Sequence, residues 1–391
     1  MPRTFIVSAF SLAMALAAGG AMIAQPDNAE AAAQQPATGM KATRGGDTTA
    51  SSSSDRQAMG PDGNRTAGAD QQSIRDTINQ LPEAKAGEMD EQILHAQVLL
   101  DAAGFSPGVI DGMEGLNFTK AIKGYQEANE LEITGELNDE TRQLLMRDKR
   151  QPTRRLTIDS SVVDGNFVRD FPDDAEGQAA LEALNYRNLL EEVAERFHTT
   201  PGVILKLNDP KTPLAVGSVL TLPNVLPTSR DYDGANIGEY SKWFNAMNVN
   251  ATGKKGDRIV VDKSEGVLRV LDADDKLIAT FPVTTGSEHD PLPLGDWKVT
   301  TYAFLPPFNY QPDLFWDVED SEESRMLPPG PNGPVGVAWL DLTKEHYGLH
   351  GTSEPQTIGY AQSHGCLRLT NWDVLKVAYM MNPGFDAEFV A

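Results

Sequence analysis

Cys366 is the only cysteine of this chain, and it lies in the polar segment 363–368, which reads SHGCLR. A histidine, His350, lies upstream in the same part of the chain. The thiolate is the reactive form of cysteine, and a neighbouring imidazole is the usual base that produces it near neutral pH. The residue types and their spacing therefore predict a nucleophilic cysteine with a histidine base, an arrangement suited to acyl transfer.

Three further residues, Ser363, His364 and Gly365, place consecutive backbone N–H groups beside the predicted nucleophile. Such a run can form an oxyanion hole, the array of donors that stabilises a tetrahedral intermediate. Gly365 has no side chain and lets the backbone approach a substrate closely. The imidazole also needs a group that orients it, and no acidic residue adjoins it. We therefore expect a backbone carbonyl near Gly351 or Thr352 to take that role.

Arg368 follows the cysteine by two positions, so in a strand both side chains would lie on one face. Its guanidinium is suited to binding a substrate carboxylate or to supporting the thiolate. The alternative is a structural ion pair with Asp373 or another acidic residue. The sequence leaves both interpretations open.

A metal site is a competing hypothesis, since His350, His364 and Cys366 are a ligand set known for zinc. His346 and His350 also have His-x-x-x-His spacing, which brings two imidazoles together only on a helix. Gly348 and its neighbours favour a strand, where the two would lie roughly 13 Å apart at about 3.3 Å per residue. The chain has no Cys-x-x-Cys motif. We therefore predict neither a metal nor a cofactor.

The bulk composition limits the class of protein. A chain of 391 residues suggests two or three domains. Its net charge of −23, from 56 acidic and 33 basic residues, argues against binding to nucleic acid or to anionic membrane surfaces.

The N-terminus has the pattern of an export signal. Arg3 precedes an apolar run at 5–18, and small residues follow as far as Ala24. The run is shorter than the ~20 residues that a spanning helix needs. We predict a signal peptide at 1–24, with cleavage after Ala31 as the alternative, and location in the periplasm at the cell wall. Exported proteins tend to pair their cysteines, so an unpaired one in a polar motif indicates chemistry.

Composition and periodicity divide the remainder of the chain. Residues 25–88 are rich in Ala, Gln, Gly, Ser, Asp and Thr and lack apolar periodicity, which predicts a disordered linker. Helical spacing predicts a three-helix domain at 89–150, with Asn138 capping its last helix. A connector follows at 151–184. An amphipathic helix, a helix capped by Thr200 and a short strand are expected at 185–227.

In the last domain, at 256–391, the apolar residues recur with a period of two. Short strands between Gly and Pro turns predict a mostly-β sandwich or barrel. The Pro-rich stretch 304–334 is long enough to be a functional loop such as a lid. Asn371 is the expected cap of a closing helix. The fold class is therefore multidomain, with a mostly-β domain after a small helical domain and a small α+β module.

The last domain resembles the L,D-transpeptidase (YkuD-like) family in its His350-Gly351-Thr352 motif, in the segment 363–368, and in Thr285-Gly286 and 293–295. The resemblance implies a mostly-β catalytic domain without metal that acts on the peptide stems of peptidoglycan. It implies Cys366 as nucleophile and His350 as base. The other residues that it implies at the site are Ser363, His364 and Gly365, with Arg368, Gly351, Thr352 and Tyr347 for substrate binding.

Two more resemblances concern the N-terminal modules. Residues 89–150 resemble the helical peptidoglycan-binding domain. Residues 185–227 resemble a LysM carbohydrate-binding module, although Tyr186-Arg187-Asn188 replaces the usual entry motif, and a structural spacer is the alternative. The expected partners are peptidoglycan stem peptides and glycan strands.

The resemblance to the transpeptidases implies an exported enzyme that forms a cysteine thioester with a tetrapeptide stem. Its acceptor would be diaminopimelate, giving 3–3 cross-links, or a lysine of an outer-membrane lipoprotein. The alternatives are an L,D-carboxypeptidase or endopeptidase that hydrolyses the stems, and a catalytically silent wall-binding protein.

Overall fold

The structure is a computed structural model that describes residues 72–73, 89–232, 240–251, 253–287, 289–312, 323–361, 363 and 365–391. All of these residues belong to one structural unit, 66–391. The predicted signal peptide and His364 lie outside the described residues, as does the predicted linker except for the short strand β1 (Gln72–Ser73). None of the helices in the described part is both long and apolar enough to cross a membrane.

The helical domain consists of α2 (Glu91–Ala103), α3 (Leu116–Ala128) and α4 (Asp139–Leu145), where the sequence predicts three helices. Asn138 caps α4 as expected, because its side chain accepts a hydrogen bond from the amide of Thr141. Gly104 ends α2 in the left-handed conformation, with φ of 96°. The three helices pack around a common apolar core that includes Leu99, Leu100, Phe118, Ile122 and Leu145.

A second unit contains β2 (Thr153–Thr157), α6 (Leu189–Arg196), α7 (Pro201–Leu207) and β4 (Val219–Pro223). Thr200 caps α7 by accepting from the amide of Val203, as predicted. β2 pairs antiparallel with β4, and β3 (Pro213–Leu214) pairs with β1. The segment 151–184, predicted to be a connector, therefore supplies a strand to this unit and also contains α5 (Ala175–Ala179). The sequence of the short strand β2 does not indicate that it pairs with β4, because β4 lies more than sixty residues later in the chain.

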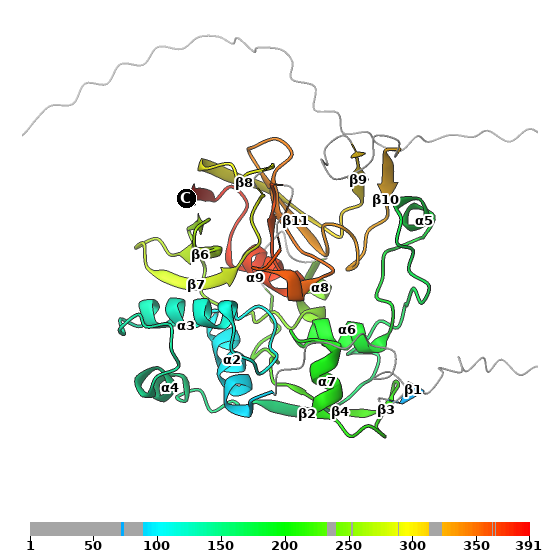
Figure 1. Ribbon diagram of the computed structural model, residues 1–391, viewed down its shortest axis with the longest axis horizontal. Coiled ribbons are helices and arrows are strands. Elements are labelled where there is room, and N and C mark those ends of the chain that lie inside the picture. The colour runs from blue at the N-terminus through cyan, green and yellow to red at the C-terminus, as the bar shows by residue number, and fades with distance from the viewer. Residues whose placement is uncertain are drawn as a thin grey trace, which may run out of the picture. The chain divides into compact units, whose positions relative to one another are not determined.

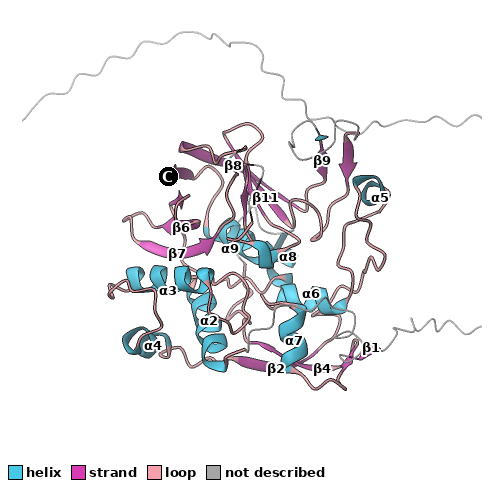
Figure 2. Cartoon of the chain, in the orientation of Figure 1, coloured by secondary structure: helices cyan, strands magenta, loops and turns pink. Residues whose placement is uncertain are grey.

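The last domain is a single curled sheet of eight strands, in the order β13-β12-β11-β8-β14-β5-β6-β7 (Figures 1 and 2). Its strands are β5 (Arg258–Asp262), β6 (Val267–Leu271), β7 (Leu277–Pro282), β8 (Gly295–Phe304), β11 (Ala338–Leu342), β12 (Gly348–His350), β13 (Leu367–Arg368) and β14 (Asp386–Val390). A bridge between Thr284 and Arg368 joins the segment after β7 to β13. The two ends of the strand order therefore meet beside the predicted nucleophile.

Helix α9 (Asn371–Met380) covers the sheet and buries Trp372 completely. Its cap is Thr370 rather than Asn371: the Thr370 hydroxyl accepts from the amide of Asp373 at 3.1 Å. The predicted cap at Asn371 is wrong because that side chain is buried and bonds distant groups instead. Its Oδ1 accepts from the amide of Val337 at 3.0 Å and its Nδ2 donates to Glu195 at 2.7 Å.

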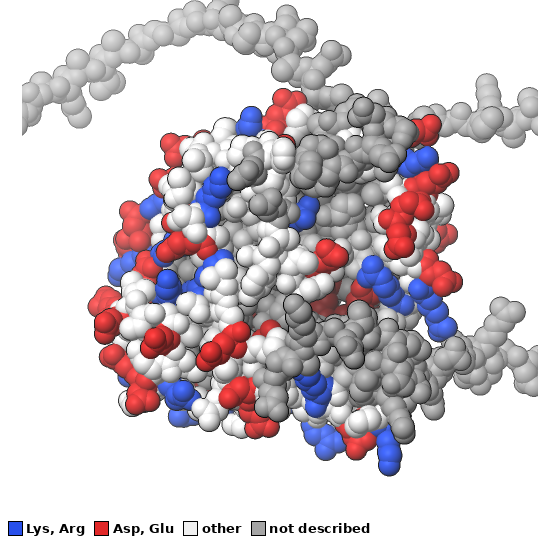
Figure 3. Space-filling view, in the orientation of Figure 1, with Lys and Arg blue, Asp and Glu red and all other residues white. Residues whose placement is uncertain are grey.

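Two elements of this domain, β14 and the 3-10 helix Pro355–Thr357, were not expected from the sequence. The helix α8 (Ser241–Ala246), which precedes the domain, was not expected either. The stretch 304–334, predicted as a loop, forms an antiparallel ribbon of β9 (Phe308–Tyr310) and β10 (Arg325–Leu327) at its described ends. On the face drawn in Figure 3, the described Lys and Arg side chains are interspersed with Asp and Glu rather than gathered in one patch.

Glu195 of α6 carries a pH-dependent contribution to stability. Burial raises its pKa from 4.5 to about 8, against the opposing effect of hydrogen bonds from Tyr186 and Asn371. Between these two values the folded protein keeps a proton that the unfolded chain has lost. The contribution is therefore fully present below pH 4.5 and is lost as the pH rises through about 8.

Because glutamine imitates the protonated side chain, Glu195→Gln should remove that loss. Urea unfolding at pH 5 and pH 9 should show the variant gaining stability over the natural chain at the higher pH. The exposed Glu182 provides a control, Glu182→Gln. An identical pH dependence in Glu195→Gln and the natural chain would contradict the assignment.

Candidate active site

Strands β12 and β13 bring the predicted nucleophile and base to one place. They pair in parallel, with Leu349 opposite Leu367 and His350 opposite Arg368. Cys366 directly precedes β13, is half-buried and is not in a disulfide. Its thiol donates to the carbonyl oxygen of His346 at 3.6 Å. The pairing of β12 with β13 thus brings the two segments together.

His350 is buried and held in a defined orientation. Its Nδ1 lies 2.7 Å from the carbonyl oxygen of Gly351. A carbonyl oxygen only accepts, so Nδ1 carries the proton and the lone pair is on Nε2. The carbonyl group of Gly351 thus contacts the imidazole of His350, as expected for the group that orients it. The indole of Trp339 stacks on the ring, with centroids 5.5 Å apart and planes at 17°.

The imidazole is neutral in this environment. Burial, then the positive charge of Arg368, lowers the pKa of His350 to about 3, although the Gly351 carbonyl favours the protonated form. Burial also raises the pKa of the Cys366 thiol, against the backbone hydrogen bond of Gly348 and the charge of Arg368. At rest the thiol of Cys366 is therefore protonated and the imidazole of His350 is neutral.

These two shifts predict how the reactivity of Cys366 depends on pH. Alkylation by iodoacetamide should accelerate as the pH rises toward and beyond the ordinary thiol value of 9.0, with no inflection near 6.5, the ordinary histidine value. The reason is that thiolate forms only by deprotonation of the thiol, since His350 does not titrate in that range. Intact-protein mass measured between pH 5 and pH 10 gives the rate, and the unlabelled control is Cys366→Ala. A rate that is already maximal at pH 6 would indicate a thiolate–imidazolium pair instead.

Arg368 lies where its charge acts on both members of this pair. Asp373, its candidate structural partner, is instead bonded to Ser106 at 2.7 Å and to Lys376 at 3.2 Å. Arg368 also lines the cavity that contains Cys366 and His350. Arg368 is therefore placed at the site, whereas Asp373 is engaged with other residues.

Ser363 and Gly365 shape the nucleophile segment. The Ser363 hydroxyl donates to the carbonyl oxygen of Cys366 at 2.6 Å, and its amide donates to Thr285 at 3.2 Å. That amide is thus engaged, and His364 lies outside the described residues, which leaves Gly365 of the three predicted donors of an oxyanion hole. The amide of Cys366 follows it directly in the chain. Gly365 has φ of 96°, and a Cβ there would lie 2.7 Å from the ring of Tyr347. Only glycine fits, because both the backbone conformation and the ring exclude a side chain.

A cavity of about 1650 Å³ contains the site. One wall holds the reactive groups and their neighbours Trp339, Tyr347, His350, Cys366 and Arg368. The other walls come from the ribbon β9–β10 and from the segment around α5. The lining residues of these walls that carry charge are Asp173, Asp174, Glu176, Glu323 and Arg325.

Gly351 and Thr352 were expected to bind substrate, but both are buried and neither lines this cavity. A Cβ on Gly351 would lie 2.0 Å from Oδ1 of Asn371, so close packing accounts for that glycine. His346 lines the cavity with an exposed side chain, 3.6 Å from Glu345. Among the described residues, no group of three or more His, Cys, Asp or Glu side chains is placed to hold a metal ion.

The sequence did not reveal two contributors to the cavity. Trp339 lies in a strand whose apolar pattern indicated only a core position, whereas its ring stacks on the base. The segment around α5 lies far from Cys366 in the sequence, within the predicted connector. No local pattern connects either of them to the reactive residues.

Comparison with known families agrees with two of the resemblances. Residues 256–388 match the L,D-transpeptidase catalytic domain, and residues 89–145 match the family described as "Putative peptidoglycan binding domain". The LysM-like module is not among these matches.

Individual relatives match the catalytic part of the chain. The chain is 34% identical over 127 residues to "Putative L,D-transpeptidase YkuD" of Bacillus licheniformis, covering 32% of this chain and 61% of that protein. It is 50% identical over 114 residues to the protein of the same description from Bacillus subtilis, covering 29% and 54%. The chain thus spans between half and two thirds of the length of these curated relatives. A crystal structure of an L,D-transpeptidase from Xylanimonas cellulosilytica is 13% identical, covers 79% of this chain and 100% of that chain, and has a TM-score of 0.32.

Proposed function

We propose that this chain, with an L,D-transpeptidase catalytic domain at residues 256–388 and a match to a peptidoglycan-binding domain at 89–145, is a cell-wall transpeptidase that uses Cys366 as its nucleophile. The observation that carries the proposal is the pairing of β12 with β13. It brings Cys366, which is not in a disulfide, and His350, which is neutral and oriented, to the lining of one large cavity. A silent wall-binding protein has no need of that arrangement.

His350, which is neutral at rest, acts as a general base: its Nε2 takes the thiol proton of Cys366 as the sulfur attacks. The sulfur attacks the carbonyl carbon on the L-centre side of an L,D peptide bond in a tetrapeptide stem. The amides of Gly365 and Cys366 stabilise the negative charge on the carbonyl oxygen. The carbon–nitrogen bond then breaks, and His350 returns the proton to the nitrogen of the leaving D-alanine. A thioester between Cys366 and the shortened stem remains.

An acceptor amine next attacks the thioester, the carbon–sulfur bond breaks, and the thiol is restored with a proton from the amine. The amine of a neighbouring diaminopimelate gives a 3–3 cross-link. A lysine of an outer-membrane lipoprotein gives a protein tether instead. If water attacks, the enzyme is an L,D-carboxypeptidase. Arg368, which lies beside the reactive pair, is suited to binding a carboxylate of the stem.

The modules and the N-terminus complete the proposal. The helical domain binds peptidoglycan. The second unit, in which β2 pairs with β4, binds glycan in the manner of a LysM module. Residues 1–24 direct export to the periplasm, where the wall lies. The acidic net charge of −23 and the interspersed surface charges support a partner other than nucleic acid.

Incubation of the protein with purified tetrapeptide muropeptides, followed by mass spectrometry, tests this function. The expected product is a dimer that has lost one D-alanine. Trimmed tripeptides without dimers would favour the hydrolase, and unchanged muropeptides would favour the silent wall-binding protein. The matched control is Cys366→Ala under the same conditions.

A further inference from the structure

We propose that the helical domain is a fixed positioning element of the active site, and that Asn117 is the residue through which it holds the nucleophile segment. The expectation from the sequence alone is of a module that delivers the enzyme to the wall. The contacts of this module reach instead to both sides of Cys366. Only the expected effect of Asn117 on turnover rests on the proposed function.

The helical domain is joined to the catalytic sheet along β7, the last strand of the strand order. Phe105 forms a parallel bridge with Thr280, the amide of Ser106 donates to Thr280 at 2.8 Å, and the amide of Thr280 donates to Gly104 at 3.1 Å. A Cβ on Gly124 of α3 would lie 2.6 Å from the Thr280 hydroxyl. The two domains therefore share backbone hydrogen bonds and close packing, as elements within one domain do.

The first anchor acts on the chain before the nucleophile. Asn117, the second residue of α3, is 8% exposed, and its Nδ2 donates to the carbonyl oxygen of Ile358 at 2.8 Å. The next residue, Gly359, has φ of 82°, and a Cβ there would lie 2.6 Å from Oδ1 of Asn117. The amide side chain and the glycine thus fit each other closely.

Hydrogen bonds continue from this anchor to the reactive segment. The amide of Gly359 donates to the hydroxyl of Thr284 at 2.9 Å. Thr284 and Arg368 exchange two backbone hydrogen bonds of 3.0 Å each. The neighbouring Gly286 forms a bridge with Ser363, whose hydroxyl bonds the carbonyl of Cys366. Displacement of Ile358 would therefore be felt on both sides of the thiol, at Ser363 and at Arg368.

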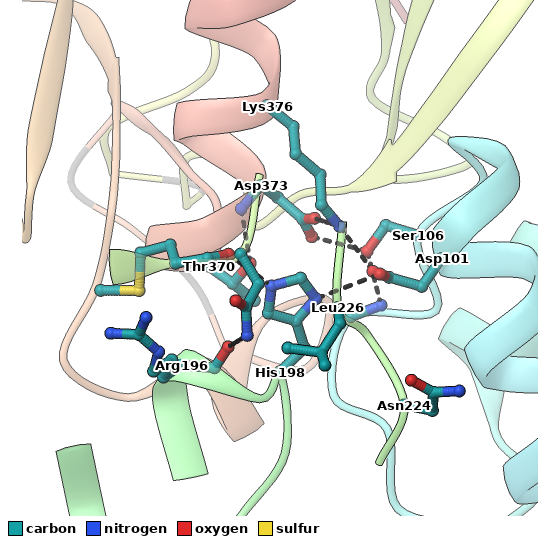
Figure 4. A network of polar contacts seen from close by, with 12 residues as sticks. Asp101, Ser106, Arg196, His198, Asn224, Leu226, Thr370, Asp373 and Lys376 are labelled. Carbon is teal, nitrogen blue, oxygen red and sulfur yellow. Dashed lines mark hydrogen bonds and ion pairs between the residues drawn. The ribbon is translucent and has the colours of Figure 1, made fainter. Parts of the chain in front are cut away.

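The second anchor acts on the chain after the nucleophile, where α9 begins (Figure 4). Ser106 donates to Asp373 at 2.7 Å, and Lys376 joins Asp373, at 3.2 Å, to Asp101 of α2. His198 of the second unit lies 3.1 Å from the same Asp101 carboxylate. The segment 358–373, which contains Cys366, is thus held at both ends by side chains of the helical domain.

Asn117→Ala tests the first anchor, and Asn129→Ala is its matched control. Asn129 follows α3 and donates its amide to the carbonyl of Tyr125 at 2.8 Å, a bond that stays within the helical domain. Hydrogen exchange read by mass spectrometry on peptides that cover 359–368 needs no substrate. We expect at least about tenfold faster exchange there in Asn117→Ala, and a change below about twofold in Asn129→Ala.

With muropeptides as substrate, kcat of Asn117→Ala should fall about tenfold while KM stays within about twofold, because the nucleophile is misplaced rather than the substrate lost. Asn117→Asp keeps the side-chain volume but loses the donor, so it should reproduce both effects if the alanine variant fails to fold. Exchange at 359–368 that matches Asn129→Ala in both Asn117 variants would overturn the proposal. Altered exchange in a protein that never forms dimers would uphold the anchor and reject the transpeptidase function.

Discussion

Cys366→Ala should keep the fold and lose turnover by more than about 10³-fold, because the thiolate forms the bond on which every later step depends. The side chain is half-buried, and its thiol contacts the carbonyl oxygen of His346 at the long distance of 3.6 Å. Its removal therefore disturbs little packing. The rate of dimer formation from tetrapeptide muropeptides measures the loss. Near-ultraviolet circular dichroism and thermal unfolding verify the fold.

Cys366→Ser sharpens this test. Serine preserves size and hydrogen bonding, yet its hydroxyl is a much weaker nucleophile beside an imidazole whose pKa is lowered to about 3. We expect no covalent intermediate in either variant, whereas the natural protein should gain the mass of a tripeptide stem. Turnover by Cys366→Ala at the natural rate would reject the mechanism as a whole.

Lys376→Met should destabilise the protein by about 3–5 kcal/mol in the free energy of unfolding, far more than the loss of a surface charge. Lys376 lies between Asp101 and Asp373, and all three side chains are nearly or fully buried. Burial acts to raise the pKa of Asp101, but the charges of Lys376 and His198 outweigh it and hold that pKa below its ordinary value. Removal of the lysine would leave two buried carboxylates without their shared cation. Unfolding in urea at pH 7 measures the loss.

Lys298→Met is the matched control, because Lys298 pairs with Asp386 at the surface, where the two side chains are 56% and 68% exposed. That substitution should cost no more than about 1 kcal/mol, since water screens such a pair. The triple variant Asp101→Asn, Asp373→Asn, Lys376→Met should regain much of the lost stability, because it removes all three charges together. Equal destabilisation by Lys298→Met and Lys376→Met would refute the importance of the buried network.

Much of the local structure was predictable from short stretches of sequence. A period of two predicted a mostly-β domain at 256–391, and Gly348 with its neighbours indicated the strand that is β12. Thr200 and Asn138 were recognisable as helix caps. The lone cysteine and the upstream histidine predicted the reactive pair. These features depend on residues within a few positions of one another, where backbone preference and side-chain spacing act directly.

Pairings between distant segments were not predictable in the same way. Asn371 has the chemistry of a cap, yet the fold uses its amide to join Val337 to Glu195, and Thr370 takes the cap. The strand β2 has its partner beyond three helices, in β4. In both cases the outcome depends on which groups meet in the folded core, and residue type alone does not specify that.

The reactive pair shows the same division. Residue types and spacing were enough to predict Cys366 as the nucleophile, His350 as its base and Gly365 beside the nucleophile. Three features depend on the folded chain: the lowered pKa of His350, the position of Arg368 in the same cavity, and the hydrogen bond from Asn117 to Ile358. Burial and long-range hydrogen bonds arise when distant segments pack together, and they set the pKa values and positions on which the reaction depends.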